Sequence, residues 1–311
     1  MSNKSQEIIL EVKKAIIGKD DIIRKVLMAI LSRGHVLLKD IPGVGKTTMA
    51  LSFSRTLGID YQRIQCTPDT TPSDIIGYSF YQKGSEELVY KPGAAMCNLL
   101  LADEINRTST KTQSALLEVM EEGNITIDGV TRPLPKPFAV IATQNPFGSA
   151  GTQLLPQSQL DRFAVCLEMG YPDFASHVNI LRDRSREQPL EQIRQVVTGE
   201  EIIAMQNEVN DITMRDELFE YVTHLAEATR NCEEILLGLS PRGALSAVRM
   251  AKANAYVDGR DYLVPQDIVD IFCDSVAHRV VISPKAKING ITEKEIINKI
   301  VNSTATPQLN T

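Results

Sequence analysis

The chain has 311 residues, a hydrophobic share of 43% and a formal net charge of -6. This length leaves room for two domains, and the acidic balance without a long Lys/Arg block argues against a dedicated nucleic-acid surface. The cysteines are odd in number and never in a C-x-x-C arrangement, which indicates reduced thiols rather than disulfides or a zinc site. Because no signal peptide and no membrane span is evident, we expect a soluble, cytoplasmic protein.

Strands and helices are predicted to alternate through the first half of the chain. Apolar residues recur at helical spacing over residues 20–31, behind two acids suited to a helix start. Short apolar runs predict buried strands at 35–38, 99–102, 138–142 and 164–167, and residues 61–65 are read as a further strand. Helices are expected at 47–57 and at 110–122, the second opened by a capping box from Thr110 to Gln113. Alternation around Asp128-Gly129 predicts a hairpin.

The pattern changes after about residue 173. From there the sequence predicts only amphipathic helices, at 174–184, 200–209, 216–229, 241–256 and 265–277. The last ten residues are expected to form a frayed tail. Alternating strands and helices predict a parallel sheet between helical layers, so we expect an α/β domain followed by an all-helical domain. Composition places the boundary between them near residues 173–195.

A glycine-rich turn between a strand and a helix carries the first functional motif, Asp40-Ile-Pro-Gly-Val-Gly-Lys46-Thr47. Glycines let backbone N–H groups converge on an anion, and the helix start adds a favourable dipole. Lys46 supplies a positive charge for phosphates, and the Thr47 hydroxyl is a suitable Mg²⁺ ligand. The strict phosphate-loop pattern is G-x-x-x-x-G-K-[ST], and Asp40 stands at its first glycine position. An acid there would repel phosphate unless its side chain points away from the loop. The alternative is a chance turn before a helix.

An acidic pair, Asp103-Glu104, follows the apolar run Leu99–Ala102. Ligand sites in open α/β sheets lie at the carboxyl ends of strands, which places this pair beside the phosphate loop. We therefore expect Asp103 to hold the magnesium shell and Glu104 to polarise the water that attacks the γ-phosphate. The alternative is a strand that merely ends in solvated acids.

Three further polar residues fit the same site. Asn145 ends another apolar strand, where it either orients the attacking water or forms an Asn-Pro turn. Arg162 precedes a strand, as an arginine finger for a neighbour's γ-phosphate or as one half of a surface ion pair. Arg242 opens a helix of the second domain, where it either reaches the nucleotide or is simply solvated.

These motifs, in this order, resemble those of the AAA+ ATPases and specifically of the MoxR group. The residues that carry the resemblance are Gly43-Val-Gly-Lys-Thr, Leu-Leu-Ala-Asp103-Glu104-Ile-Asn-Arg, Ala-Thr-Gln-Asn145-Pro, Leu-Asp-Arg162-Phe and Ser-Pro-Arg242. The likeness covers nearly the whole chain. It implies a P-loop NTPase αβα domain with a parallel sheet over residues 1–190, a helical lid over 191–311, and assembly into a ring that is usually a hexamer.

The resemblance also implies residue roles for ATP and Mg²⁺. It implies an adenine pocket at Ile17 and Gly18 and a Walker A loop made by Pro42, Gly43, Val44, Gly45, Lys46, Thr47 and Thr48. It implies that Thr47 and Asp103 hold Mg²⁺, that Glu104 activates water and that Asn145 is sensor 1. Arg162 would be the finger acting in trans and Arg242 would be sensor 2 acting in cis. Inserts near 78–91 and 123–135 would project toward the ring pore or a partner.

The function implied by the resemblance is ATP-driven, chaperone-like remodelling of partner proteins, among them proteins with von Willebrand factor A domains. Two alternative functions are compatible with the same fold. A nucleic-acid motor is disfavoured by the acidic net charge. A non-catalytic nucleotide-dependent scaffold is hard to reconcile with Glu104, whose position serves hydrolysis rather than binding.

Overall fold

Five parallel strands form the central sheet of the computed structural model, which describes residues 4–41, 43–84, 87–145, 155–184 and 189–308. Their spatial order is β2-β5-β8-β1-β9, and every neighbouring pair is parallel. The strands are β1 (Val36–Lys39), β2 (Tyr61–Gln65), β5 (Leu99–Asp103), β8 (Ala139–Gln144) and β9 (Val165–Leu167). The five predicted strands are therefore confirmed, each within two residues of its expected ends.

Side chains that alternate along these strands enter two separate cores. Val36 and Leu38 of β1 join the core that holds α1 (Lys4–Lys13), α2 (Asp20–Leu31) and α3 (Lys46–Leu57). Leu37 points to the opposite face, where the core includes α4 (Pro72–Ile76) and α5 (Thr110–Glu122). Because successive strand residues face opposite sides, a continuous apolar run is what a sheet covered on both faces requires. The predicted αβα sandwich is confirmed.

The start of α5 differs in detail from the prediction. Ser109, not Thr110, is the N-cap residue: its backbone is extended, and its Oγ accepts a hydrogen bond from the backbone N–H of Thr112. Gln113 does not return to the helix start. Its buried Nε2 donates instead to the carbonyl oxygens of Ile105 and Thr108. The predicted capping box was wrong because Gln113 is drawn into the core by those two carbonyl groups.

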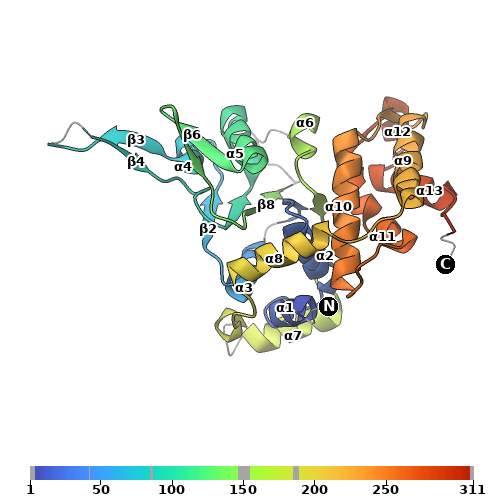
Figure 1. Ribbon diagram of the computed structural model, residues 1–311, viewed down its shortest axis with the longest axis horizontal. Helices are drawn as coiled ribbons and strands as arrows, with labels where there is room; N and C mark the ends of the chain where they lie inside the picture. The colour runs from blue at the N-terminus through green and yellow to red at the C-terminus, as the bar shows by residue number, and fades with distance from the viewer. Residues whose placement is uncertain (1–3, 42, 85–86, 146–154, 185–188, 309–311) are drawn as a thin grey trace.

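Two antiparallel hairpins extend from the sheet domain. The first, β3 (Tyr78–Tyr81) with β4 (Leu88–Lys91), projects farthest from the body of the molecule (Figure 1). The second, β6 (Asn124–Ile127) with β7 (Val130–Pro133), follows α5 directly. Its turn residues Asp128 and Gly129 both have positive φ, 52° and 75°, as a two-residue hairpin turn demands. The predicted hairpin is confirmed.

The second half of the chain is mainly helical, as predicted. Its helices are α7 (Phe174–Arg184), α8 (Gly199–Asn210), α9 (Asp216–Arg230), α10 (Pro241–Val257), α11 (Pro265–Val276), α12 (Pro284–Ile288) and α13 (Glu293–Ser303), with α6 (Gln157–Leu160) just before them. A small antiparallel sheet, β10 (Ile235–Leu237) with β11 (Val281–Ile282), was not predicted. Strands this short carry no readable alternation. Also unpredicted were α1 and α13, and α13 extends into the expected tail.

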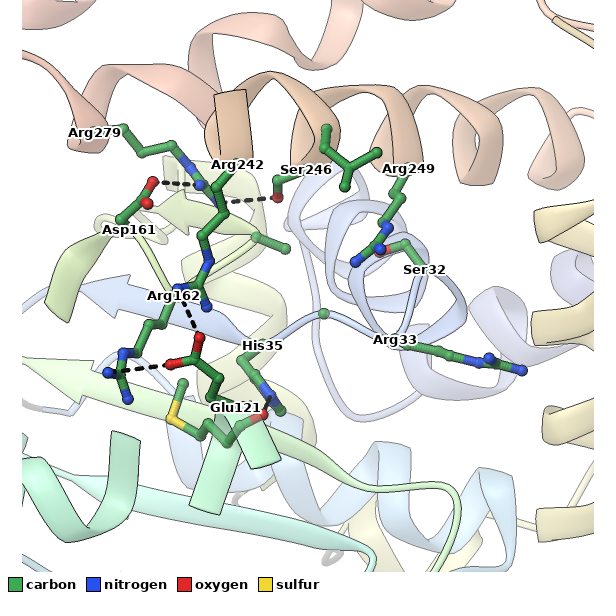
Figure 2. Close-up of a pocket in the computed structure, with 14 residues that line it drawn as sticks. Ser32, Arg33, His35, Glu121, Asp161, Arg162, Arg242, Ser246, Arg249 and Arg279 are labelled. Atoms are coloured by element: carbon green, nitrogen blue, oxygen red, sulfur yellow. Dashed lines mark hydrogen bonds and ion pairs between the residues drawn. The ribbon is translucent and has the colours of Figure 1, made fainter. Parts of the chain in front are cut away.

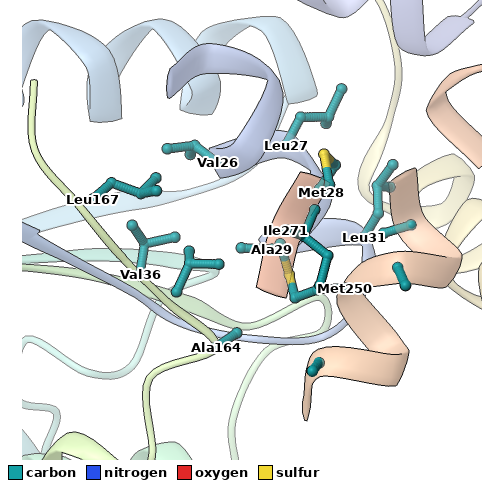
Figure 3. Packing of buried hydrophobic residues seen from close by; sticks show 14 of the residues in the cluster. Val26, Leu27, Met28, Ala29, Leu31, Val36, Ala164, Leu167, Met250 and Ile271 are labelled. Atoms are coloured by element: carbon teal, nitrogen blue, oxygen red, sulfur yellow. The ribbon is translucent and has the colours of Figure 1, made fainter. Parts of the chain in front are cut away.

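The helices of the second half pack onto the sheet domain rather than standing apart from it. Met250 of α10 and Ile271 of α11 lie against the apolar face of α2, in the same core as Val36 of β1 (Figure 3). The predicted boundary at residues 190/191 remains a prediction. Among the described residues, no helix is long and apolar enough to cross a membrane.

Candidate nucleotide site

The glycine-rich turn lies between β1 and α3, as the sequence predicted. Gly43 and Gly45 adopt positive φ values of 85° and 97°, which only glycine reaches without strain. Lys46 is the first residue of α3, and its buried Nζ donates a hydrogen bond to the carbonyl oxygen of Asp40 at 3.1 Å. Thr47 and Thr48 follow in the first helical turn. Pro42, also predicted to contact nucleotide, lies outside the described residues.

The carboxylate of Asp40 points away from the phosphate nest, as expected of an acid at that position. It is 5% exposed and accepts backbone hydrogen bonds from Ile41, Met169 and Gly170. The last two donors belong to the segment that follows β9. Asp40 therefore ties the loop after β1 to the loop after β9 and presents no negative charge to a phosphate.

The acidic pair ends β5, next to the phosphate loop. Thr143 of β8 joins its two members: the Thr143 Oγ1 donates to Asp103 Oδ1 at 2.6 Å and accepts from the backbone N–H of Glu104 at 2.8 Å. Glu104 has φ of 58°, a conformation that costs energy in a non-glycine residue and is found at functional sites. One threonine thus holds the carboxylate of Asp103 and the backbone of Glu104, although the sequence reasoning gave it no role.

Both carboxylates also contact arginines. Arg63 of β2 lies 2.7 Å from Asp103 Oδ2, and Arg107 lies 2.8 Å from Glu104 Oε2. Sequence reasoning missed both arginines. Arg63 stands in a strand, and the parallel register of β2 with β5 pairs it with Leu101, two residues before Asp103, from where its side chain reaches the Asp103 carboxylate.

A pocket of about 400 Å³ opens between these elements. It is lined by Gly43, Gly45, Lys46, Thr47, Thr48, Arg63, Gln65, Asp103 and Glu104. Glycine backbone, a lysine, a hydroxyl and a carboxylate form a donor set that suits a triphosphate with Mg²⁺. Within the described chain no cluster of three His, Cys, Asp or Glu could hold a metal ion, but Mg²⁺ at such a site takes most of its ligands from phosphate and water.

The segment predicted to hold adenine lies beside this loop. A Cβ atom added to Gly45 would meet Ile16 Cδ1 at 3.9 Å, which places Ile16, the residue before the predicted Ile17-Gly18 pocket, next to the phosphate turn. Gly18 has φ of 72° and is closely approached by the side chain of Ser176 at the start of α7. Any larger residue at position 18 would collide with that serine.

Asn145 follows β8 at the same edge of the sheet as the acidic pair. Its carbonyl oxygen accepts a hydrogen bond from Asn106 Nδ2 at 3.3 Å. Asn106 itself lies in the 3₁₀ turn Ile105–Arg107, directly after Glu104. The structure thus brings Asn145 to the predicted edge of the sheet, and its role as sensor 1 remains a prediction.

Arg162 and Arg242 lie together, but at a different place from the phosphate pocket. Both form ion pairs with Glu121 in the last turn of α5, at 3.1 Å for Arg162 and 3.0 Å for Arg242 (Figure 2). They line a separate cavity of about 200 Å³ together with Gly34 and His35. Sequence reasoning placed Arg242 at the chain's own nucleotide, whereas the structure places it beside Arg162.

This second cavity lies at the amino-terminal edge of the sheet. Gly34 and His35 precede β1, whereas the phosphate loop follows it, and Arg162 precedes β9. A strand rises about 3.3 Å per residue, so the four residues of β1 alone separate the two edges by roughly 13 Å. Arg162 and Lys46 of one chain therefore lie at opposite edges of the sheet.

His35 fastens this edge. Its Nδ1 accepts from the backbone N–H of Val140 at 3.0 Å, so its Nε2 carries the proton and donates to the carbonyl oxygen of Met120, also at 3.0 Å. Burial lowers the pKa of His35 to about 4, which keeps the imidazole neutral. The expectation that His35 packs at a strand start is confirmed, and the residue also anchors the end of α5 that carries Glu121.

A second network docks the helical domain beside Arg162. Arg279 is 4% exposed and lies 2.6 Å from Asp161, the residue next to Arg162. Its Nη2 also donates to the carbonyl oxygen of Phe163 and to Ser246 of α10. Sequence reasoning overlooked this pair because its members are far apart in the chain.

Comparison with known proteins agrees with this arrangement. Residues 35–165 match the family described as "ATPase family associated with various cellular activities (AAA)", and residues 227–300 match the family described as "AAA lid domain". The chain is 43% identical to the protein YeaC of Bacillus subtilis (strain 168), over 95% of this chain and 92% of that protein. It is 39% identical to "Chaperone MoxR1" of Mycobacterium tuberculosis (strain ATCC 25618 / H37Rv), over 97% and 82%.

A solved structure is similar over nearly its full length. It is the crystal structure of a candidate ATPase from Cytophaga hutchinsonii ATCC 33406, with a TM-score of 0.92 and 36% identity over 98% of this chain and 96% of that one. A phosphate loop after β1 and an acidic pair after β5, on a sheet of this strand order, define a P-loop nucleotide-binding fold of the AAA class. The chain belongs to the MoxR group of AAA+ ATPases.

Proposed function

We propose that this protein binds ATP with Mg²⁺ at the pocket between Lys46 and the acidic pair and hydrolyses it. The observation that carries the proposal is the pair of hydrogen bonds that Thr143 makes with the Asp103 carboxylate and with the backbone of Glu104. These bonds hold the two acidic residues beside the glycine-rich phosphate loop, in the same pocket. A mere nucleotide-binding scaffold has no need for a strained Glu104 at this position.

Each residue then has a distinct task. Backbone N–H groups of the loop and Lys46 hold the phosphates, and Ile17 with Gly18 borders the base. Thr47 and Asp103 hold the magnesium ion, which neutralises phosphate charge when bound. Glu104 accepts a proton from the attacking water, and Asn145 orients that water. Both acids are paired with arginines in this structure. For the acids to act on bound ATP and Mg²⁺, Asp103 must release Arg63 and Glu104 must release Arg107.

We further propose that the protein works as a ring, with six protomers as the expected number. Arg162 lies at the edge of the sheet opposite the protomer's own phosphate loop, which supports a role at the nucleotide of a neighbour. Arg242 shares Glu121 with Arg162, which supports its action on that same neighbouring nucleotide instead of in cis. ATP turnover per protomer should therefore fall on dilution below the concentration of ring assembly. Turnover that stays constant through ring dissociation would contradict the proposal.

The Glu104→Gln variant tests the catalytic assignment. It keeps the size and most hydrogen-bonding capacity of the side chain but cannot accept the proton. We expect ATP to bind with unchanged affinity while turnover falls by about a hundredfold or more, the scale of a lost general base. Glu118→Gln, at an exposed acid of α5, is a matched control that should keep full turnover. Unchanged turnover in Glu104→Gln would remove Glu104 from its role.

In this proposal, ATP hydrolysis drives the remodelling of a partner protein. The relative named "Chaperone MoxR1" supports this class of function, and proteins with von Willebrand factor A domains are the partners we expect. The hairpin β3–β4 projects from the body and exposes Tyr78, Phe80 and Tyr81, as a surface for polypeptide contact would. Pull-down with Glu104→Gln in ATP should retain such a partner. A cytoplasmic location is supported by the five unpaired cysteines.

A further inference from the structure

We infer that Glu121 competes with the neighbour's γ-phosphate for Arg162 and Arg242, and that it must release these arginines before they can act. This inference rests on the proposed action of Arg162 on a neighbouring nucleotide. The two oxygens of the Glu121 carboxylate are divided between the arginines: Oε2 contacts Arg162 and Oε1 contacts Arg242. Figure 2 shows both arginine side chains directed at this one acid.

A carboxylate that bridges two guanidinium groups occupies the position that a phosphate group would take between them. Arginine presents planar donors that match carboxylate and phosphate oxygens equally well. Arg162 comes from the segment before β9 and Arg242 from α10, so the acid holds together two arginines from separate parts of the fold. The pair is thereby preorganised for one anion, while the single carboxylate of Glu121 offsets one of its two positive charges.

The position of Glu121 is unfavourable for its own helix. It lies in the last turn of α5, whose dipole disfavours negative charge, and that turn contains no basic residue. Helix stability therefore does not explain an acid there, whereas the two ion pairs do. The side chain of Glu121 is 39% exposed, and those of Arg162 and Arg242 are 27% and 46% exposed, so the pairs are weak and open to exchange.

Exchange requires no covalent step. When a neighbouring protomer presents a bound triphosphate, its γ-phosphate carries more negative charge than one carboxylate and displaces Glu121 from the arginines. When the phosphate leaves, Glu121 recaptures them. Glu121 thus makes engagement of the arginines conditional on the neighbour's nucleotide, and its removal should favour the engaged state.

Mixed rings test this inference. Arg162→Ala protomers keep an intact pocket but lack the finger, and Glu104→Gln protomers keep the finger but cannot turn over ATP. Neither is active alone, so activity of the mixture comes from Arg162→Ala pockets served by Glu104→Gln neighbours. We expect Glu121→Gln, added to the Glu104→Gln protomer, to raise the turnover of the mixture about threefold or more, which corresponds to the loss of two exposed ion pairs.

Controls separate competition from a structural role. Glu121→Gln placed instead in the Arg162→Ala protomer should leave the turnover unchanged, because that protomer has no finger to release. The neighbouring substitution Glu122→Gln, at an exposed acid of the same turn, should have no effect in either protomer. Each protomer's own ATP affinity should stay the same, and thermal melting confirms that the variants fold.

Two results would overturn the inference. Lower or unchanged turnover with Glu121→Gln in the finger-bearing protomer would show that the acid orients the arginines or has no part in their action. A changed turnover when Glu121→Gln is placed in the Arg162→Ala protomer would show that Glu121 acts on the ATP bound to its own protomer. A mixture that stays inactive before Glu121 is changed would instead refute action in trans itself, and with it the proposal on which the inference rests.

Discussion

Asp161 and Arg279 form an ion pair of 2.6 Å that fastens the helical domain to the sheet domain directly beside Arg162. The side chain of Arg279 is 2% exposed and that of Asp161 is 22% exposed. Burial lowers the pKa of Arg279, and Asp161 opposes that shift. Since Asp161 precedes Arg162 in the chain, the docking of the helical domain and the placement of Arg162 depend on the same short segment.

Removal of this acid should destabilise the protein strongly. Asp161→Ala leaves the Arg279 guanidinium buried without its counter-charge, which we expect to lower the free energy of unfolding by about 3 kcal/mol. Chemical denaturation measures the change. Asp258→Ala, which removes a carboxylate exposed at 42% from its pairs with Arg24 and Arg260, should cost less than about 1 kcal/mol. Equal losses in the two variants would contradict a special role for Asp161.

Restoration of the strict phosphate-loop pattern should destabilise the protein and weaken its binding of ATP. Asp40→Gly creates the generic first glycine, but it removes the acceptor for the backbone N–H groups of Ile41, Met169 and Gly170. We expect the free energy of unfolding to fall by about 2 kcal/mol or more and ATP affinity to decrease. Asp40→Asn, which keeps one acceptor oxygen, should lose less. Tighter ATP binding by Asp40→Gly would show that the acid repels phosphate after all.

Thr143→Val tests whether the threonine positions the acidic pair. Valine has nearly the same shape but cannot bond to the Asp103 carboxylate or to the backbone N–H of Glu104. We expect kcat to fall by about tenfold, equivalent to roughly 1.4 kcal/mol, with little change in KM. Steady-state kinetics at a ring-forming concentration measures both. Thr143→Ser, which retains the hydroxyl, should keep most activity, and an equal loss in serine and valine variants would count against the bridge.

Stability should decline as the pH falls from about 6.5 to 4, in part through His35. Its folded pKa of about 4 lies below the ordinary 6.5, so the unfolded state binds the proton first and stability rises with pH in this window. The full contribution is about 3 kcal/mol. His278, whose pKa burial and Arg279 lower to about 3, acts in the same direction.

A variant isolates the part that His35 contributes. His35→Asn keeps an acceptor for the backbone N–H of Val140 but does not titrate in this range. Its free energy of unfolding, measured by urea denaturation at several pH values, should be lower at pH 7 and should rise less steeply between pH 4 and 6.5. Parallel curves for the variant and the wild type would show that His35 is not the titrating group.

Local patterns in the sequence predicted most of the fold. Buried strands such as Leu99–Asp103 are recognisable because a sheet covered on both faces needs uninterrupted apolar residues. The hairpin at Asp128-Gly129 follows from the backbone conformations that a two-residue turn imposes. By contrast, β10 and β11 pair across more than forty residues and are too short to show a period, so no local signal could reveal them.

The nucleotide pocket was predictable for a related reason. Parallel strands all end at one edge of the sheet, so residues that follow separate strands must meet there. Lys46, Asp103, Glu104 and Asn145 each stand in such a position. Thr143 could have been found by the same rule, because it is a polar residue near the carboxyl end of a buried strand, but its bond to the acidic pair depends on the register of β8 with β5.

The amino-acid sequence by itself therefore determined the phosphate loop, the acidic pair and their place at the carboxyl edge of the sheet, because chain direction alone brings those residues together. Only the tertiary structure decided which way Asp40 faces and where Arg242 lies. Both depend on contacts between segments far apart in the chain: Asp40 with the backbone after β9, and the lid with Asp161 through Arg279. Those contacts place Arg242 with Arg162 and Glu121 at the edge of the sheet opposite the chain's own phosphate loop.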